Sequence, residues 1–214
     1  MPAKKEAAER PYHHGSLRET LLEVGEGLIE EKGVAAFTLR ECARRAGVSH
    51  GAPAYHFGDA TGFLSELAAS GFEELDALMT RYRSEDRPEP YAQFVATGRA
   101  YVDYALRHPG RFQLMFRSEK LELDAPRLRE AADRTFGQLM ETLSVLPRRG
   151  TDRGEGLSID EQAGLAWAIV HGVASLTLDN PGFAACVGGE REASAALERM
   201  LFAASGAFGV LPEA

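Results

Sequence analysis

The chain is poor in the residues and segments that mark secreted, membrane-spanning and disulfide-rich proteins. Only two of its 214 residues are cysteine, Cys42 and Cys186, and neither has a metal-type partner nearby. Both lie in apolar helical patterns, so we expect two buried thiols and no need for an oxidising compartment. No stretch approaches the length of a membrane span, and the first residues have no apolar signal core. We therefore expect a cytoplasmic protein without a membrane partner.

The sequence also lacks motifs that carry catalysis or hold a cofactor. It has no His-x-x-x-His, no Cys-x-x-Cys and no glycine loop that cradles a phosphate. His13 and His14 are adjacent, and adjacent side chains point in different directions, which favours a surface role over a metal site. His108 and His171 are the other histidines that an enzyme would use. We predict no enzyme, no metal site and no cofactor.

Acidic residues outnumber basic ones, but the excess is confined to one part of the chain. The formal net charge is -8. Residues 1–56 hold 8 Lys and Arg against 8 Asp and Glu, whereas the remainder holds 16 against 24, so the whole excess follows residue 56. An acidic body opposes wrapping by DNA, so any DNA contact is expected within the first part, with a modest electrostatic contribution.

Residues 38–57 carry the most informative pattern. Thr38 and Glu41 have the spacing of a capping box, which predicts the start of a helix. Gly47 supplies a turn, and Ser49 has the residue type that caps a second helix. Two short helices joined by a tight turn form a helix-turn-helix, whose second helix fits a DNA major groove.

A further helix is expected just before this motif. Ser16 and Glu19 repeat the capping-box spacing, and apolar residues then recur at helical intervals. Lys32 and Gly33 place a cation and a glycine at the end of this helix. The three helices together make a compact unit that presents one helix for reading DNA.

Four segments support a resemblance to a known family. They are Tyr12-His13-His14-Gly15-Ser16-Leu17-Arg18, Gly33-Val34-Ala35-Ala36-Phe37-Thr38-Leu39-Arg40, Ala43-Arg44-Arg45-Ala46-Gly47-Val48-Ser49 and Trp167-Ala168-Ile169-Val170-His171-Gly172. The first three resemble the N-terminal domain of the tetracycline-repressor (TetR) family of transcription regulators. The fourth resembles the Trp-x-x-x-His-Gly (WHG) signature of one type of ligand-binding domain that follows this N-terminal domain in the sequence. The resemblance implies a homodimeric, DNA-binding regulator, most often a repressor.

The helical pattern divides the chain into three parts and predicts an all-α, TetR-like fold of nine helices. Residues 1–11 form a polar, disordered tail, residues 12–58 form the helix-turn-helix head, and residues 59–214 form a helical body. Ser158 and Glu161 are expected to cap the helix at about 158–179. This helix and the last one, about 190–208, are apolar nearly all round. We expect them to pair with the same helices of a second chain in a four-helix dimer interface.

Eight side chains of the head are candidates for contact with a double-stranded DNA operator. The base-contact candidates lie near the start of the reading helix, and the phosphate-contact candidates flank it. The base-contact candidates are Ser49, His50, Gly51, Ala52 and Tyr55, and the phosphate-contact candidates are Thr38, Arg40 and His56. Two heads related by a two-fold axis would read a pseudo-palindrome.

Two positions depart from the family pattern. Ala54 stands where the family usually has a tyrosine, and Ala60 stands where it commonly has a lysine. Both of the missing groups usually hold phosphates, so their loss lowers DNA affinity and flattens its salt dependence. Either Tyr55 and the histidines compensate, or the head binds DNA weakly. The alternative function is a TetR-like dimer with a degenerate head that acts through protein partners.

The body is expected to hold a small apolar effector. Its mid-chain aromatic residues and one methionine form the candidate pocket lining, with His171 as a polar group one turn after Trp167. The candidates are Phe94, Tyr101, Tyr104, Phe112, Met115, Phe116, Trp167 and His171. In the family such an effector changes the separation of the two heads, which requires that it bind one spacing better than the other.

Overall fold

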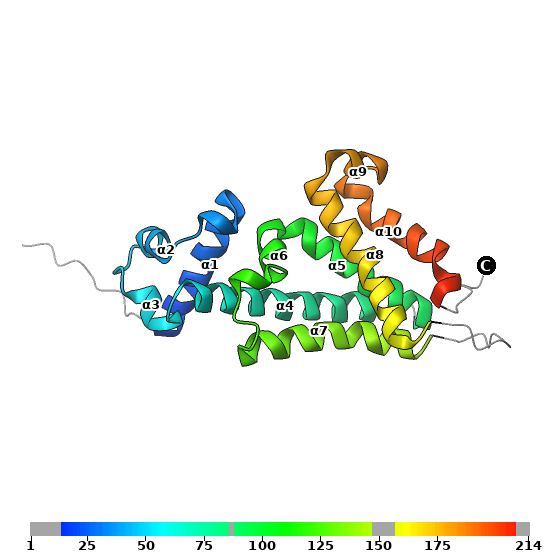
Figure 1. The fold of residues 1–214 in the computed structure, drawn as a ribbon, viewed down its shortest axis with the longest axis horizontal. Helices are drawn as coiled ribbons and strands as arrows, with labels where there is room; N and C mark the ends of the chain where they lie inside the picture. Colours follow the sequence, from blue (N-terminus) through cyan, green and yellow to red (C-terminus); the bar gives the residue numbers. More distant parts are fainter. Residues whose placement is uncertain (1–13, 86–87, 147–156, 209–214) are drawn as a thin grey trace, which may run out of the picture.

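A computed structural model describes residues 14–85, 88–146 and 157–208, and over these residues the protein is helical without strands (Figure 1). The helices are α1 (His14–Lys32), α2 (Leu39–Ala46), α3 (Ala52–Phe57), α4 (Ala60–Glu85), α5 (Pro90–Arg107), α6 (Pro109–Met115), α7 (Pro126–Ser144), α8 (Ile159–Asp179), α9 (Pro181–Cys186) and α10 (Ala193–Ala203). The predicted all-α class is confirmed. The predicted tail of residues 1–11 lies outside the described residues.

The prediction of nine helices is wrong by one, because a short helix, α9, follows α8. The side chain of Asn180 accepts a hydrogen bond from the backbone N–H of Phe183 at 3.0 Å, and Pro181 occupies the first helical position. Proline favours the first position of a helix, where its missing N–H has no partner to lose. Pro181 therefore ends one helix and begins the next, whereas the sequence pattern predicted only the ending.

Two of the predicted helix starts are confirmed in their capping geometry. The Thr38 hydroxyl accepts a hydrogen bond from the backbone N–H of Glu41 at 3.2 Å at the start of α2. At the start of α8, Ser158 and Glu161 form a complete capping box. In both cases a side-chain oxygen satisfies a backbone donor that has no partner within the helix.

Two other predicted caps are wrong. Helix α1 begins at His14, so Ser16 lies inside it rather than before it. Helix α3 begins at Ala52, with Gly51 at the capping position and no side-chain cap, while Ser49 lies two residues further back. The residue type was suitable in both places, but the helices begin two or three residues away from it.

Helix α4 is the longest helix and joins the head to the body (Figure 1). Near its start Phe63 is fully buried, stacks on Phe37 and meets Phe57 edge-on, with ring centroids 4.8 and 4.6 Å away. The rest of α4 packs against α5, α6 and α7. One continuous helix therefore contributes to the cores of both parts.

Helices α5, α8 and α10 pack closely on the other side of the body. Gly98 of α5 permits this approach, because a Cβ at that position would lie 3.2 Å from Leu197 and 3.3 Å from Val170. Those are tight contacts for any larger residue, so glycine sets the distance between α5 and its two neighbours.

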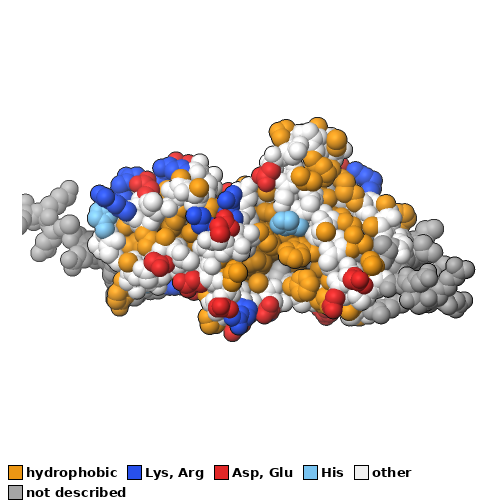
Figure 2. Space-filling model, viewed as in Figure 1, with side chains coloured by type: hydrophobic (Ala, Val, Ile, Leu, Met, Phe, Trp, Pro, Cys, Tyr) orange, Lys and Arg blue, Asp and Glu red, His pale blue; other side chains and the backbone are white. Residues whose placement is uncertain are grey.

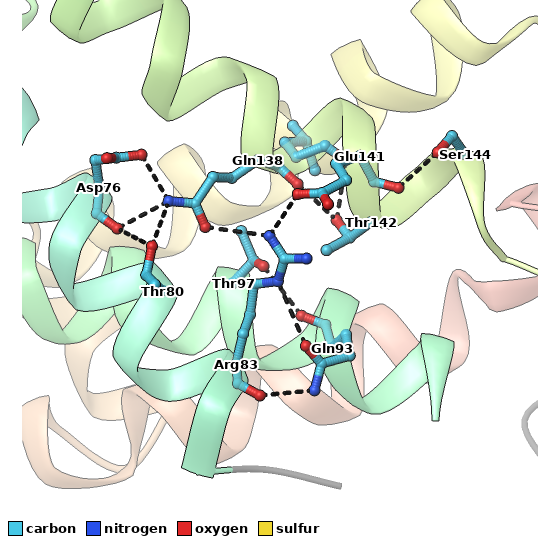
Figure 3. A network of polar contacts seen from close by, with 10 residues as sticks. Asp76, Thr80, Arg83, Gln93, Thr97, Gln138, Glu141, Thr142 and Ser144 are labelled. Atoms are coloured by element: carbon cyan, nitrogen blue, oxygen red, sulfur yellow. Dashed lines mark hydrogen bonds and ion pairs between the residues drawn. The ribbon is translucent and has the colours of Figure 1, made fainter. Parts of the chain in front are cut away.

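A network of polar contacts fastens α7 to α4 and α5 at the far end of the bundle (Figure 3). The Gln138 amide donates to the backbone carbonyl and side chain of Asp76 at 2.8 and 2.6 Å. Arg83 donates to the Glu141 carboxylate at 2.8 Å, and the Gln93 amide donates to the Arg83 carbonyl at 2.8 Å. These bonds give α7 a fixed position along α4 that apolar packing alone does not specify.

The two cysteines differ in burial, although the sequence predicted that both are buried. Cys42 is buried, its Sγ lies 3.4 Å from the carbonyl of Leu21, and burial raises the pKa of its thiol to about 11. Cys186 is exposed on α9, so the prediction of two buried thiols is wrong for this one.

Over the described residues, none of the helices combines the length and hydropathy of a membrane span.

We predict opposite effects of alanine at two glycines of α1. A Cβ on Gly25 would lie 2.4 Å from the buried ring of Phe63, whereas nothing lies within 4 Å of one on Gly27. Gly27→Ala should raise the free energy of unfolding by about 0.5–1 kcal/mol through helix propensity. Gly25→Ala should lower the free energy of unfolding by about 1–2 kcal/mol, because the clash with Phe63 destabilises the fold by more than the higher helix propensity of alanine stabilises it. Urea denaturation at one fixed protein concentration tests both, and a stabilised Gly25→Ala variant would contradict the packing described here.

Candidate functional site

The turn between α2 and α3 presents α3 at one end of the molecule (Figure 1). Gly47 ends α2 in the left-handed conformation, with φ 69°, which glycine adopts at little cost. The next residue, Val48, donates from its backbone N–H to the Ala43 carbonyl at 3.0 Å. On α3 the side chains of Pro53 and Phe57 are buried, so the helix is anchored by one face and free on the other.

Six of the eight DNA-contact candidates are exposed in the structure. Tyr55 is 85% exposed, whereas an aromatic ring that packs in a core is mostly buried. Ala52 and His56 are half-buried, and the ring of His56 meets that of Tyr55 edge-on at 5.3 Å. The exposed candidates besides Tyr55 are Thr38, Arg40, Ser49, His50 and Gly51. Ala54 and Ala60 are also exposed, so nothing else occupies the places of the two missing phosphate ligands.

Most cations of the described head are already paired with carboxylates. Arg44 and Arg45 both bind Glu41, at 2.7 and 3.3 Å, and Arg45 also binds Glu31 at 2.5 Å. The side-chain hydrogen bond from Arg44 lowers the pKa of Glu41 to about 2, so this carboxylate stays charged. Among residues 14–58, Arg40 is the Lys or Arg side chain with no ion pair, which makes it the cation most available to a phosphate.

The segment Gly47-Val48-Ser49-His50-Gly51 has the Gly-x-Ser-x-Gly spacing of a hydrolase nucleophile elbow, which corrects the expectation that the sequence lacks every catalytic motif. That motif requires a strand before the serine and a helix after it. Here helix α2 precedes the segment and no strand is present among the described residues. The spacing is therefore a consequence of the helix-turn-helix and not a catalytic site.

An apolar cavity of about 470 Å³ lies in the body between α4, α5, α7 and α8. Its wall includes four of the eight predicted effector residues, namely Phe94, Tyr101, Phe116 and Trp167. The remaining lining residues are Phe72, Met79, Thr97, Gly98, Ala132, Asp133, Thr135, Phe136, Leu139, Ala166, Val170 and Leu201. In Figure 2 hydrophobic side chains gather on the face where α6, α7 and α8 approach one another.

The other four predicted effector residues lie behind the cavity wall. Phe112 and His171 pack on Tyr101, with ring centroids at 5.5 and 6.3 Å. Tyr104 is buried under the Arg111 guanidinium, 5.7 Å from the ring centroid. Met115 is buried against Gly71 of α4. These four residues support the cavity wall and the α6 helix rather than face the cavity.

A chain of hydrogen bonds joins Tyr101 of the cavity wall to His171 beside it. The Tyr101 hydroxyl lies 2.8 Å from Nδ1 of His171, and Nε2 lies 3.2 Å from the hydroxyl of Ser175. Burial raises the pKa of Tyr101, against a smaller lowering by a hydrogen bond from Trp167, and burial lowers the pKa of His171. Tyr101 therefore donates to a neutral imidazole whose proton is on Nε2.

Helix α6 connects the cavity wall to the head. At its start the backbone N–H groups of Gly110 and Arg111 donate to the Glu30 carboxylate of α1, at 2.9 and 3.1 Å. The buried Arg111 side chain binds Glu74 of α4 and lies 3.3 Å from Glu26 of α1. A carboxylate at a helix start satisfies free backbone donors and complements the helix dipole.

Sequence reasoning missed twelve of the sixteen residues that line the cavity and the contact between α1 and α6. Phe72, Phe136 and Leu139 follow the same helical periods as ordinary core residues, and only the packing of α4 against α7 brings them to the cavity. The contact of Glu30 with the start of α6 joins residues 80 positions apart. No local pattern indicates such a pair, although Pro109-Gly110 did indicate a helix boundary.

We predict a pH dependence of stability that His171 carries in part. Because burial lowers its pKa in the folded state, the unfolded chain takes up the proton first as pH falls. This contribution is complete above the unfolded pKa of about 6.5 and is lost as pH falls below it. In His171→Gln the free energy of unfolding should therefore fall less between about pH 7.5 and 5.5 than in the parent. Equal slopes in urea titrations would show that His171 is not buried as described.

Both parts of the chain match families of known proteins. Residues 21–67 match the family described as bacterial regulatory proteins, tetR family, and residues 94–204 match the tetracyclin repressor-like C-terminal domain. The HTH-type transcriptional regulator BetI of Stenotrophomonas maltophilia (strain R551-3) is 35% identical over 86 residues, which cover 40% of this chain and 42% of BetI. The chain thus aligns with less than half of that regulator.

Solved structures share the whole architecture. A protein of unknown function from Rhodococcus sp. RHA1 has a TM-score of 0.68 at 33% identity, over 90% of this chain and 98% of its own. RolR, solved in complex with the ligand resorcinol, has the same fold with a TM-score of 0.56 at 17% identity, over 93% of this chain and 96% of its own. With a helix-turn-helix in its head and family matches over both head and body, the chain belongs to the TetR family of transcriptional regulators.

Proposed function

We propose that this protein is a ligand-responsive regulator, most often a repressor in such families, that binds a pseudo-palindromic operator as a homodimer and changes its DNA affinity when a small apolar effector enters its cavity. The observation that carries the proposal is helix α6, which supports the wall of the cavity at one end and binds the head through Glu30 at the other. A ligand that changes the cavity wall therefore acts on the element that positions the reading helix.

Sequence reading is assigned to the exposed face of α3 and the turn before it. His50 and Tyr55 offer hydrogen-bonding groups to base edges, and Gly51 and Ala52 permit close approach, with Ala52 suited to a thymine methyl. Arg40 and Thr38, at the start of α2, are assigned to phosphates. Because the other head cations are held by carboxylates, we expect few phosphate contacts and a shallow dependence of affinity on salt.

The test is selection of DNA from a random pool by the purified protein, followed by affinity measurements across a salt series. We expect an enriched palindrome. Tyr55→Ala and His50→Ala should each weaken binding of that site by roughly five- to a hundredfold, because each removes a base contact worth about 1–3 kcal/mol. Arg40→Gln should weaken binding to all sequences alike and reduce the salt slope by about one contact.

One control variant and two possible outcomes distinguish the proposed DNA-binding function from its alternative. Arg44→Gln should leave the salt slope nearly unchanged, because Arg44 is already bound to Glu41 at 2.7 Å. Reading-helix variants that bind the selected site like the parent would contradict the assignment of α3. A folded protein that enriches no DNA, with or without effector, would favour the alternative function, in which the head carrying Ala54 and Ala60 acts through a protein partner.

The dimer is assigned to α8 and α10. Leu176 of α8 and Met200 and Phe202 of α10 are large apolar side chains with 43%, 37% and 57% exposure, which a single chain leaves in water. Two copies of this helix pair related by a two-fold axis would cover them and place two α3 helices on one side of the assembly.

Phe202→Asp should therefore dissociate the dimer. A carboxylate placed at the centre of an apolar interface costs several kcal/mol when it is buried without a partner, and it costs nothing in water. Analytical ultracentrifugation should show a dissociation constant raised by at least about a hundredfold. The matched control is Phe136→Asp, which is also exposed but lies on α7 beside the cavity. Equal dimerisation of the parent and the Phe202 variant would move the interface elsewhere.

A further inference from the structure

The charge of the cavity lining is one-sided. None of its residues is Lys, Arg or His, and Asp133 of α7 is its one ionisable acid. Asp133 is exposed at the cavity and makes no ion pair or hydrogen bond with any other described residue. A carboxylate without a partner beside an apolar cavity favours a positively charged group and repels a negatively charged one.

The hydroxyl groups that line the cavity already have partners within the protein, and the Trp167 N–H is directed at the Tyr101 hydroxyl. The Thr97 hydroxyl donates to the Gln93 carbonyl at 3.0 Å, and the Thr135 hydroxyl donates to the Ala131 carbonyl at 2.9 Å. The Tyr101 hydroxyl is held by His171. A carboxylate or phosphate that entered would lose its water without gaining a donor, which is costly in an apolar site.

Aromatic rings line the cavity from its floor to its mouth. Phe136 and Trp167 are 45% and 44% exposed, with ring centroids 6.4 Å apart and an interplanar angle of 69°. Asp133 precedes Phe136 by three residues on α7, so both lie on the same face of that helix. An organic cation at the mouth would meet two aromatic rings and a carboxylate together, which is the arrangement that binds alkylammonium groups.

We propose that the effector of this cavity is an amphipathic organic cation, with its apolar body among the inner rings and its ammonium group at the mouth beside Asp133, Phe136 and Trp167. This inference rests on the proposed role of the cavity as the effector site. A neutral aromatic ligand would use the same inner rings but gain nothing from the carboxylate. An anionic ligand would be repelled by it.

The experiment uses three probes that share one body and differ in charge: 3-phenylpropylammonium, 3-phenylpropanol and 3-phenylpropanoate. Isothermal titration calorimetry of the full chain should give the cation at least about fivefold tighter binding than the alcohol, and the carboxylate the weakest binding. The preference for the cation should shrink as salt is added, because the mouth is exposed to solvent.

Three variants test separately whether Asp133 causes the preference for a cation and whether the probes bind in the cavity at all. Asp133→Asn should reduce the preference for the cation to about twofold or less and leave binding of the alcohol unchanged. Glu130→Gln makes the same charge change on α7 at an exposed residue outside the lining, and should retain the preference. Ala132→Phe fills the cavity from its wall and should weaken binding of all three probes.

The outcomes are distinguishable. Binding of the alcohol as tight as that of the cation, abolished by Ala132→Phe, would overturn the cationic effector and leave the proposed effector site standing. A cation preference that survives Asp133→Asn would overturn the role of Asp133 and with it this inference. Absence of binding for all three probes would overturn both the inference and the proposed role of the cavity.

Discussion

Both parts of the molecule depend on the continuity of α4. Its first turns carry Phe63 into the core of the head, and its later turns carry Leu75 and Met79 into the core of the body. A break in this helix would leave two apolar surfaces without a partner, so its 26 residues must move nearly as one rigid element. Any motion of the head relative to the body therefore involves a change in the packing of α1 or α6 against α4.

Local sequence patterns predicted the parts that local chemistry controls. Thr38 and Ser158 capped their helices as expected, and Gly47 made the turn of the helix-turn-helix, because each acts through backbone atoms within three or four residues. Ser16 and Ser49 had suitable side chains, but α1 begins two residues before Ser16 and α3 begins three residues after Ser49, and residue type alone does not distinguish between neighbouring start positions.

The cavity shows the same limit at a larger scale. Aromatic type alone identified Phe94, Tyr101, Phe116 and Trp167 as lining residues, but it also selected Tyr104 and Phe112, which support the wall from behind. Whether a ring on a helix faces a cavity or its neighbour depends on the rotation of that helix. In this chain the rotation depends on polar contacts such as those of Arg83 and Gln138, and these join helices whose pairing the sequence does not encode locally.

The buried ionic junction at the base of the head has a mechanical consequence. Arg111 lies between carboxylates from α1 and α4, and the Glu30 carboxylate closes the start of α6. A small sliding of α1 past α6 would pull the carboxylates away from the Arg111 guanidinium, which is buried and would lose its partners before water replaced them. The junction thus favours a few discrete orientations of the head relative to the body and disfavours the continuous range between them.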